Sequence, residues 1–380
     1  MFEKELDELL KKDLLRYIVS RRSPQGPVIA VGKKKYVNFA SNDYLGLAAH
    51  PEISRAAMDA VKRYGAGSGA SRLLAGGNVL HEELEKRVAR FKRTEAALLF
   101  NSGYAANTGI IPAIAAEDDV IFSDELNHAS IIDGCRLSRA KTLVYRHKDM
   151  KHLESLMKKA GAGRKIVITD SVFSMDGDIA PLRDICGLCV RHKAFLYLDD
   201  AHGTGVLGKG RGGIAHFNIK PEPWMLQMGT FSKALGSYGA FAAGSRAAIQ
   251  WISNTARSFI FSTALPPGVV GASLAALRLI EEDPSLINRL WENRAVMVRG
   301  LESIGFDARG SETPVIPLIT ADVRSALRLS DHLFKNGIYA PAIRPPSVKG
   351  PRLRLAVTAA HTGRHINMLI KGLKDFRAGR

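Results

Sequence analysis

The sequence predicts an α/β protein whose larger part is a mostly parallel β-sheet flanked by helices. From about residue 51 onward, helical and strand patterns alternate, which is typical of a parallel sheet covered on both faces. The chain has 380 residues, 46% of them hydrophobic and 24% charged, an ordinary globular composition. This length suffices for one large domain and a smaller one.

The expected elements follow in order along the chain. Leu6, Leu9, Leu10, Leu14 and Ile18 fall near one face of a helix. A strand is expected at residues 35–41. Helices are then expected at residues 52–64, 81–91, from 104 onward, 129–137, 150–160 and 182–192. Strands are expected between them, at residues 96–100, 120–123, 142–145, 166–169 and 195–198.

The C-terminal part predicts a second, smaller α+β lobe. After two consecutive prolines at 266–267 come two long helical stretches, a strand at 315–319, another helix, a strand at 352–357 and a terminal helix. We therefore expect an N-terminal segment (1–45) that joins the small domain, a cofactor-binding major domain (46–270) and a C-terminal domain (271–380).

Polar clusters at the ends of five expected strands predict one shared site. They occupy residues 101–104, 124–128, 170–174, 199–202 and 230–233. In open α/β sheets, ligands bind beyond the carboxyl ends of the strands. We therefore expect these five loops to converge.

The residue types in these loops suit a phosphorylated, cationic heterocycle. Asp199 can pair with a protonated ring nitrogen, and Gly103 and Tyr104 begin a helix whose free N–H groups can bind phosphate. Thr230 can add a hydroxyl group to the phosphate site. Lys233 stands among Gly, Ala, Ser and Thr residues, which leave room for a flat cofactor. This combination predicts pyridoxal phosphate (PLP) in a Schiff base with Lys233.

Seven motifs together resemble those of the α-oxoamine synthases. In order, they are NFASNDYLGL, GSGASRLLAGG, FNSGYAAN, DELNHASIIDG, SVFSMDGD, LDDAHGTGVLG and GTFSKALG. The resemblance implies a fold-type I PLP enzyme, a homodimer, that joins an amino acid to an acyl thioester with loss of carbon dioxide. AIRPPSVKG followed by RLRLAVTAAHT is most similar to the branch in biotin biosynthesis. That branch condenses L-alanine with pimeloyl-CoA or a pimeloyl carrier-protein thioester.

The resemblance implies roles for residues around the cofactor. Lys233 would form the Schiff base and act as acid and base at the α-carbon, and Asp199 would pair with the ring nitrogen. His128 would stack on the ring and polarise the acyl carbonyl group. The remaining cofactor contacts would come from His202 and Ser174 near the phenolic oxygen, from Gly103, Tyr104 and Thr230 at the phosphate, and from Ser262 or Thr263 of the partner subunit.

The resemblance also implies a set of substrate contacts. Arg354 would bind the alanine carboxylate, because a planar guanidinium matches a carboxylate in two contacts. Arg16, Asn42 and Ser347 match positions that contact substrate in relatives, as does His128. Asp170 stands where many relatives carry glutamate.

Three alternative functions remain open at this point. A sister synthase would use glycine with acetyl-CoA or succinyl-CoA, as glycine C-acetyltransferase does, and an aminotransferase could share the fold. A nucleic-acid-binding protein is suggested by the formal charge of +17. Between residues 11 and 36 there are eight Lys or Arg against one acid, but elsewhere the basic residues are dispersed. No zinc-finger spacing or RNA-binding aromatic motif accompanies them.

Composition sets the remaining expectations. We expect a cytoplasmic protein with no membrane or nucleic-acid partner and no metal, because signal-peptide and membrane-helix patterns are absent. Cys186 and Cys189 lie in an apolar helical pattern without a second pair, so core packing is expected. Residues 208–213 (GKGRGG) fit G-x-G-x-x-G, but we expect no helix to begin there and hence no dinucleotide site.

Overall fold

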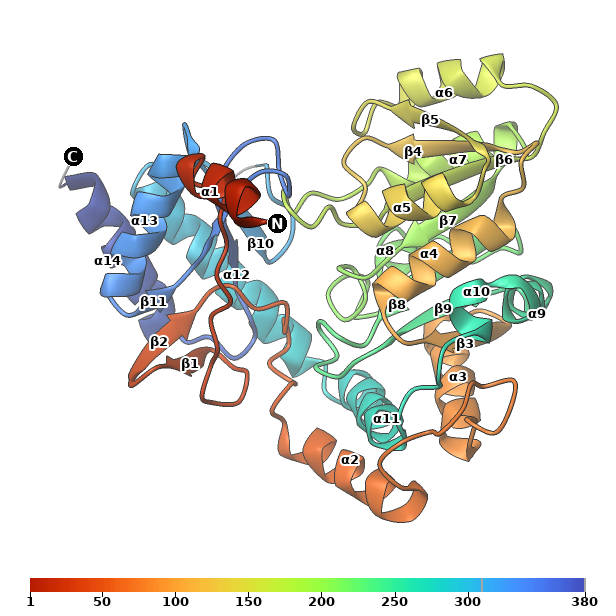
Figure 1. The fold of residues 1–380 in the computed structure, drawn as a ribbon, viewed down its shortest axis with the longest axis horizontal. Helices are drawn as coiled ribbons and strands as arrows, with labels where there is room; N and C mark the ends of the chain where they lie inside the picture. Colours follow the sequence, from red (N-terminus) through yellow and green to blue (C-terminus); the bar gives the residue numbers. More distant parts are fainter. Residues whose placement is uncertain (309, 379–380) are drawn as a thin grey trace. The chain divides into compact units, whose positions relative to one another are not determined.

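The computed structural model describes residues 1–308 and 310–378, and the chain divides into two compact units (Figure 1). Unit 1 comprises Met1–Ala49, Met175–Asp178 and Asn288–Arg380. Unit 2 comprises His50–Ser174 and Ile179–Ile287.

Unit 2 contains a seven-stranded sheet with the order β3-β9-β8-β7-β6-β4-β5 (Figure 1). Its strands are β3 (Ala96–Phe100), β4 (Val120–Asp124), β5 (Lys141–Tyr145), β6 (Lys165–Asp170), β7 (Phe195–Asp199), β8 (Met225–Thr230) and β9 (Ala240–Gly244). The five strands from β4 to β8 are parallel, whereas β9 is antiparallel to both β3 and β8. The predicted α/β fold with a mostly parallel sheet is confirmed.

Helices cover both faces of this sheet. The helices of unit 2 are α2 (Pro51–Tyr64), which packs against α11, and α3 (Val79–Lys92), α4 (Gly103–Ile114), α5 (Ala129–Leu137), α6 (Met150–Lys159), α7 (Leu182–Arg191), α8 (Gly213–His216), α9 (Arg246–Thr255), α10 (Arg257–Ile260) and α11 (Pro267–Glu282). Successive residues of a strand point to opposite faces, so Ile121 of β4 joins one core and Phe122 the other. Cys186 and Cys189 are buried in the second core, as expected.

Unit 1 contains two three-stranded sheets and its own hydrophobic core. One sheet has the order β1 (Val28–Val31), β2 (Lys34–Asn38), β11 (Ile338–Tyr339), and the other β10 (Val315–Ile319), β13 (Arg352–Ala356), β12 (Ala342–Ile343). The helices are α1 (Glu3–Lys11), α12 (Ser285–Ser303), which begins in unit 2, α13 (Val323–Lys335) and α14 (Gly363–Ala378).

Several elements differ from the expectations. Helix α1 ends at Lys11 rather than continuing to Ile18, because Asp13 adopts a left-handed backbone with φ 57°. The last residue of the segment 208–213, Gly213, begins α8, although no helix was expected to begin there; α8 has only four residues. The expected domain boundary at residue 271 falls inside α11, which packs against α2 and α3 within unit 2.

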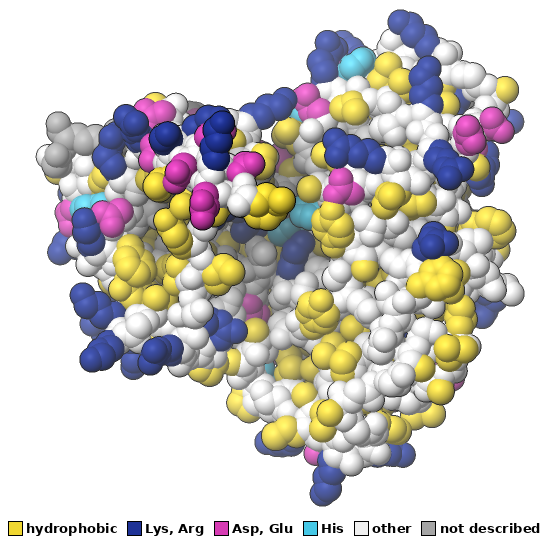
Figure 2. All heavy atoms as spheres, viewed as in Figure 1, with side chains coloured by type: hydrophobic (Ala, Val, Ile, Leu, Met, Phe, Trp, Pro, Cys, Tyr) yellow, Lys and Arg dark blue, Asp and Glu magenta, His cyan; other side chains and the backbone are white. Residues whose placement is uncertain are grey.

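The surface shows no single basic stripe on the visible face. Figure 2 shows Lys and Arg side chains scattered over this face, with hydrophobic side chains between them. None of the helices in the described ranges combines the length and the hydrophobicity that a membrane span requires.

Candidate active site

Seven of the predicted site residues line one hollow of unit 2, with a volume of about 230 Å³. We call it the Lys233 hollow. These seven residues are Gly103, Tyr104, His128, Asp199, His202, Thr230 and Lys233. They come from the start of α4, the loop before α5 and the segments that follow β7 and β8. The parallel strands end at one edge of the sheet, which brings these loops together.

The first turn of α4 offers free backbone donors to the hollow. Ser102 caps the helix, and its hydroxyl oxygen accepts a hydrogen bond of 3.1 Å from the Ala105 amide. Within the described chain, the amides of Gly103 and Tyr104 donate to no protein acceptor. Free N–H groups and the helix dipole together favour an anion such as phosphate.

Asp199 is a buried carboxylate whose hydrogen bonds come from neutral groups. Its side chain is only 4% exposed, and it accepts bonds from Asn107 Nδ2 at 2.8 Å and from the Ala201 amide at 3.0 Å. The hydroxyl of Tyr197 donates to Asn107 Oδ1 at 2.7 Å, which fixes the orientation of the amide. A buried carboxylate held by neutral donors favours a cationic ligand.

The surroundings of His128 determine which ring nitrogen carries its proton. The Ser130 amide donates to His128 Nδ1 at 3.3 Å, and the Ser130 hydroxyl lies 2.7 Å from the same nitrogen. That hydroxyl oxygen also accepts a bond of 2.8 Å from Asn107. Because Nδ1 accepts, the proton of the neutral ring lies on Nε2.

The same environment keeps the His128 ring neutral. Burial lowers the pKa of His128, the negative charge of Asp199 opposes this effect, and the nearby Lys233 lowers the pKa further. The net effect lowers the pKa, so the ring is a neutral hydrogen-bond donor at neutral pH.

Asp170 is a second carboxylate at this edge of the sheet, and its environment favours the neutral form. It pairs with Asp199 across β6 and β7 and lines the Lys233 hollow. Full burial and the adjacent charge of Asp199 raise the pKa of Asp170 well above its usual value. Its Oδ2 accepts a bond of 2.8 Å from the His128 amide. The site therefore favours a neutral Asp170 beside Asp199.

The end of β8 places Thr230 and Lys233 in the hollow. Thr230 Oγ1 donates to the Gly239 carbonyl at 2.7 Å and lies 2.7 Å from Ser232 Oγ. Its proton is therefore directed toward the protein, and Ser232 supplies a second hydroxyl in the same hollow.

These residues fit PLP. The free amides of α4 suit the phosphate, the Asp199 carboxylate suits a protonated ring nitrogen, and Lys233 suits the aldehyde carbon. All three groups line the same hollow.

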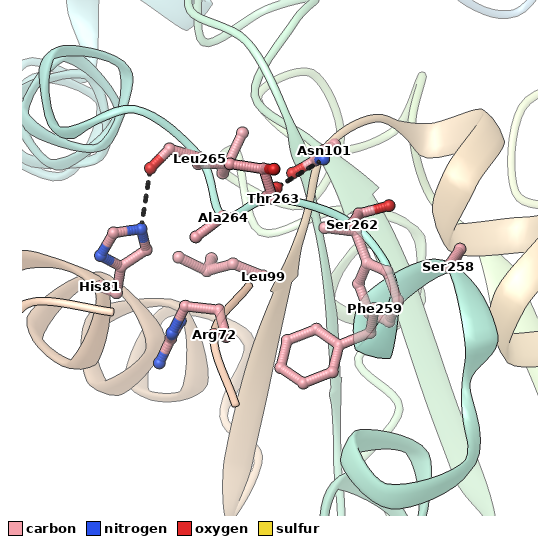
Figure 3. A pocket seen from close by; sticks show the side chains of 11 residues that line it. Arg72, His81, Leu99, Asn101, Ser258, Phe259, Ser262, Thr263, Ala264 and Leu265 are labelled. Atoms are coloured by element: carbon pink, nitrogen blue, oxygen red, sulfur yellow. Dashed lines mark hydrogen bonds between the residues drawn. The ribbon is translucent and has the colours of Figure 1, made fainter. Parts of the chain in front are cut away.

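Three other predicted cofactor contacts lie outside the lining of this hollow. Ser262 and Thr263 line a different small hollow of unit 2, where Asn101 Nδ2 donates to the Thr263 carbonyl at 2.9 Å (Figure 3). Their assignment to the partner subunit's cofactor stays a prediction. Ser174 lies in a turn just after Phe173 and is partly buried.

The predicted substrate contacts of unit 1 form two groups. Arg354, in β13, is 9% exposed and donates to Asn42 Oδ1 at 3.0 Å and to the Tyr44 hydroxyl at 3.1 Å. Arg16 instead donates to the carbonyl groups of Arg344 and Pro345, at 3.1 and 2.8 Å. Ser347 donates its amide to the Arg344 carbonyl at 3.1 Å.

Four residues in the hollow had no role assigned from the sequence: Asn107, Ser130, Asp170 and Ser232. Asp170 and Ser232 belong to the clusters 170–174 and 230–233 that were expected to converge, whereas Asn107 and Ser130 lie outside the five clusters. All four lie in or beside the quoted motifs, which was a usable signal. Their importance depends on hydrogen bonds between distant segments, such as the bond between Asn107 and Asp199.

Comparison with known proteins decides the family. Residues 34–373 match the family described as aminotransferase class I and II. The chain belongs to the class I and II aminotransferases, in their α-oxoamine synthase group. This family member is 49% identical to an 8-amino-7-oxononanoate synthase of Geobacter sulfurreducens, over 94% of this chain and 93% of that protein. It is 45% identical to the 8-amino-7-oxononanoate synthase of Thermoanaerobacter pseudethanolicus, over 98% of this chain and 95% of that protein.

Solved structures support the same family. The serine palmitoyltransferase of Sphingomonas wittichii superposes with a TM-score of 0.93 at 28% identity, over 99% of this chain and 97% of that chain. A solved structure of SPT (serine palmitoyltransferase) with PLP has the same TM-score and the same sequence identity. Its superposition covers 99% of this chain and 98% of that chain. The family member described here therefore has the fold-type I architecture expected from its motifs.

Proposed function

We propose that the protein is a PLP-dependent 8-amino-7-oxononanoate synthase, which condenses L-alanine with a pimeloyl thioester and releases carbon dioxide and the thiol. The observation that carries this proposal is the convergence of Lys233, Asp199 and the free amides of α4 in one hollow. Relatives of that name match nearly the full length of the chain. When bound, PLP supplies an electron-accepting ring that stabilises negative charge on the α-carbon of an amino acid.

Each lining residue then has a separate task. The Lys233 amine holds the cofactor and afterwards moves the proton at the α-carbon of alanine. Asp199 holds a proton on the ring nitrogen, because its carboxylate is buried among neutral donors. The amides of Gly103 and Tyr104 bind the phosphate group.

His128 would activate the second substrate. Its Nε2–H is a neutral donor, since Nδ1 is occupied by Ser130. A hydrogen bond from Nε2 to the acyl oxygen would stabilise the negative charge that develops there when the α-carbon attacks. The lowered pKa of His128 keeps this proton arrangement at neutral pH.

We assign recognition of the alanine carboxylate to Arg354. Its guanidinium is held in place by Asn42 and Tyr44, and a fixed planar group binds a carboxylate at a low entropic cost. Arg16 and Ser347 would contact the acyl chain or its carrier.

The proposal includes a homodimer in the cytoplasm. Large hydrophobic side chains of unit 2 are exposed, among them Leu74 at 81% and Phe261 at 70%. Exposed apolar surface of this kind is typical of an interface between subunits. Phe261 directly precedes Ser262 and Thr263, so an interface there would place both residues near the partner subunit. Sedimentation of the purified protein tests the dimer.

The decisive experiment measures thiol release with matched pairs of substrates. We expect the specificity constant for alanine with a pimeloyl thioester to exceed that for glycine with acetyl-CoA or succinyl-CoA. Borohydride reduction should fix the cofactor covalently to Lys233, and peptide mapping should identify that residue. The control variant Lys151→Ala, which changes an exposed lysine of α6, should give the same modified peptide. A preference for glycine and acetyl-CoA would overturn the substrate assignment, and attachment to another lysine would overturn the site.

A further inference from the structure

A second hollow of unit 2 has a basic lining. Its volume is about 730 Å³, within the range of small-molecule binding sites. It lies among the end of α3, the loop 208–212, α8, the segment 218–221 and β8. We call it the basic hollow; it shares no lining residue with the Lys233 hollow.

The two hollows lie on opposite faces of the large sheet. Gln227 and Met228 are successive residues of β8, and successive side chains of a strand point to opposite faces. Met228 lines the Lys233 hollow, whereas Gln227 lines the basic hollow. A ligand of the basic hollow would therefore not occupy the proposed catalytic site.

Among the described residues, the lining carries several positive charges and no carboxylate. Its cations are Lys92, Arg93, Lys209, Arg211 and Lys220. Two of them have acidic partners, since Lys92 pairs with Asp200 at 2.6 Å and Lys220 lies 3.9 Å from Glu222. The other three form no ion pair with any residue in the described part of the chain. Three uncompensated cations around a concave surface produce a positive potential that attracts anions.

A buried donor in the same lining points to a specific ligand. Gln227 is 2% exposed, and its Nε2 atom has no hydrogen-bond partner within residues 1–308 and 310–378. Nearly all buried polar groups in proteins have a partner, and leaving one without a partner is unfavourable. An acceptor oxygen of a ligand in the hollow would satisfy this donor.

The lining also has an apolar part. Ile214, Ile219 and Pro221 contribute hydrophobic surface beside the cations. Inorganic phosphate alone would leave this surface without a contact. A ligand with several anionic oxygens and a planar or apolar group would use both parts of the hollow.

We propose that the basic hollow binds a phosphate-bearing anion of nucleotide size. The phosphates contact Arg93, Lys209 and Arg211, one of their oxygens accepts from Gln227, and the base or sugar lies on the apolar wall. Lys209 and Arg211 belong to the glycine-rich segment 208–213. This segment binds through side chains rather than through a helix terminus, because α8 has only four residues.

Calorimetric titration of the full-length PLP-bound protein with ADP tests the proposal. The test variant is Arg93→Ala/Lys209→Ala/Arg211→Ala, and the matched control is Lys62→Ala/Lys86→Ala/Lys159→Ala, which removes the same charge from exposed positions of unit 2. We expect the test variant to weaken ADP binding at least tenfold and the control to change it less than threefold. Gln227→Leu should weaken ADP binding at least threefold with no change in charge.

Two further comparisons test which part of the ligand is recognised and where the ligand binds. Adenosine, which has no phosphate, should bind at least tenfold more weakly than ADP. If adenosine and ADP bind equally, or if ADP binds the test variant as tightly as the unmodified protein, the proposal is wrong. The second result would mean that ADP binds outside the basic hollow. Turnover of alanine with a pimeloyl thioester is measured separately on the same variant, so the outcome does not depend on the proposed function.

Discussion

Asp199 and Asp200 are adjacent carboxylates with contrasting environments. Asp199 accepts hydrogen bonds from the neutral Asn107 amide and Ala201 backbone. Asp200 is fully buried and pairs with Lys92 at 2.6 Å, and it also accepts from Ser171, Thr204 and the Gly213 amide. The protein therefore supplies the counter-charge for Asp200 itself.

The difference follows from the alternation of side chains at the end of β7. Asp199 lines the Lys233 hollow, while Asp200 contacts Lys92, a lining residue of the basic hollow on the other face. A buried carboxylate with an internal cation is a structural group. A buried carboxylate that has only neutral donors and faces a hollow is available to a ligand. The surroundings of a residue are therefore a better guide to its function than the residue type.

Asp199→Asn should produce the largest effect on activity. The amide can still accept from Ala201, but it cannot hold a proton on the ring nitrogen of PLP. We expect turnover of alanine with a pimeloyl thioester to fall by roughly 10²–10³-fold. Loss of the acceptor for Asn107 Nδ2 should lower the free energy of unfolding by only about 1–3 kcal/mol. Exchange of the alanine α-proton, followed by NMR, isolates the affected step. Retention of most of that exchange would mean that Asp199 does not pair with the ring nitrogen.

Asp200→Asn should reverse the pattern, with a large loss of stability and little loss of turnover per folded molecule. The substitution leaves the fully buried Lys92 ammonium without its counter-charge, which costs about 3–5 kcal/mol. Urea unfolding measures the loss. The double variant Lys92→Met/Asp200→Asn is the control, because removing both charges should restore part of the stability. If Asp200→Asn unfolds like the unmodified protein, the ion pair contributes little.

The sequence predicted much of the large sheet and the central residues of the site. Parallel strands with polar ends brought His128, Asp199 and Lys233 into one hollow, as expected. Strand β9 was missed because its sequence, AFAAG, lacks the β-branched residues that indicate strands. Its position depends on pairing with both β3 and β8.

Side-chain networks were less predictable than the strands. Asn107 contacts Asp199 across 92 residues of sequence, and no local pattern encodes such a bond. Thr230 was correctly placed at the hollow, but its proton is directed to Gly239, which depends on the path of the segment after β8. Hydrogen-bond direction is a property of tertiary structure rather than of residue spacing.

Ser130→Ala tests the link between Asp199 and His128. The Ser130 hydroxyl contacts His128 Nδ1 and accepts a hydrogen bond from Asn107. Its removal therefore weakens the preference for the His128 ring proton to lie on Nε2. We expect turnover to fall about tenfold, equivalent to about 1.4 kcal/mol. The matched control is Ser138→Ala, at the other end of α5, where a buried hydroxyl donates to the Cys135 carbonyl. Equal losses of turnover in both variants would show only a general loss of stability.

Asp170→Asn should have the smallest effect at neutral pH. Burial and the neighbouring charge of Asp199 raise the pKa of Asp170, so an amide resembles the form that the native protein favours. Asparagine can also accept the hydrogen bond from the His128 amide. We therefore expect turnover to stay within about threefold of the unmodified protein. A loss as large as that of Asp199→Asn would show that Asp170 must be ionised for catalysis.

The effect of Asp170→Asn on stability should depend on pH with a defined sign. Between the unfolded pKa, near 3.8, and the raised native pKa, the native protein binds more protons at Asp170 than the unfolded chain does. The contribution of this group to the free energy of unfolding therefore falls as pH rises through that interval, because the buried carboxylate must ionise. The variant lacks this titration, so its stability relative to the unmodified protein should increase from acidic to alkaline pH. Urea unfolding at several pH values measures the difference, and a constant difference across the range would mean that Asp170 has the same pKa in both states.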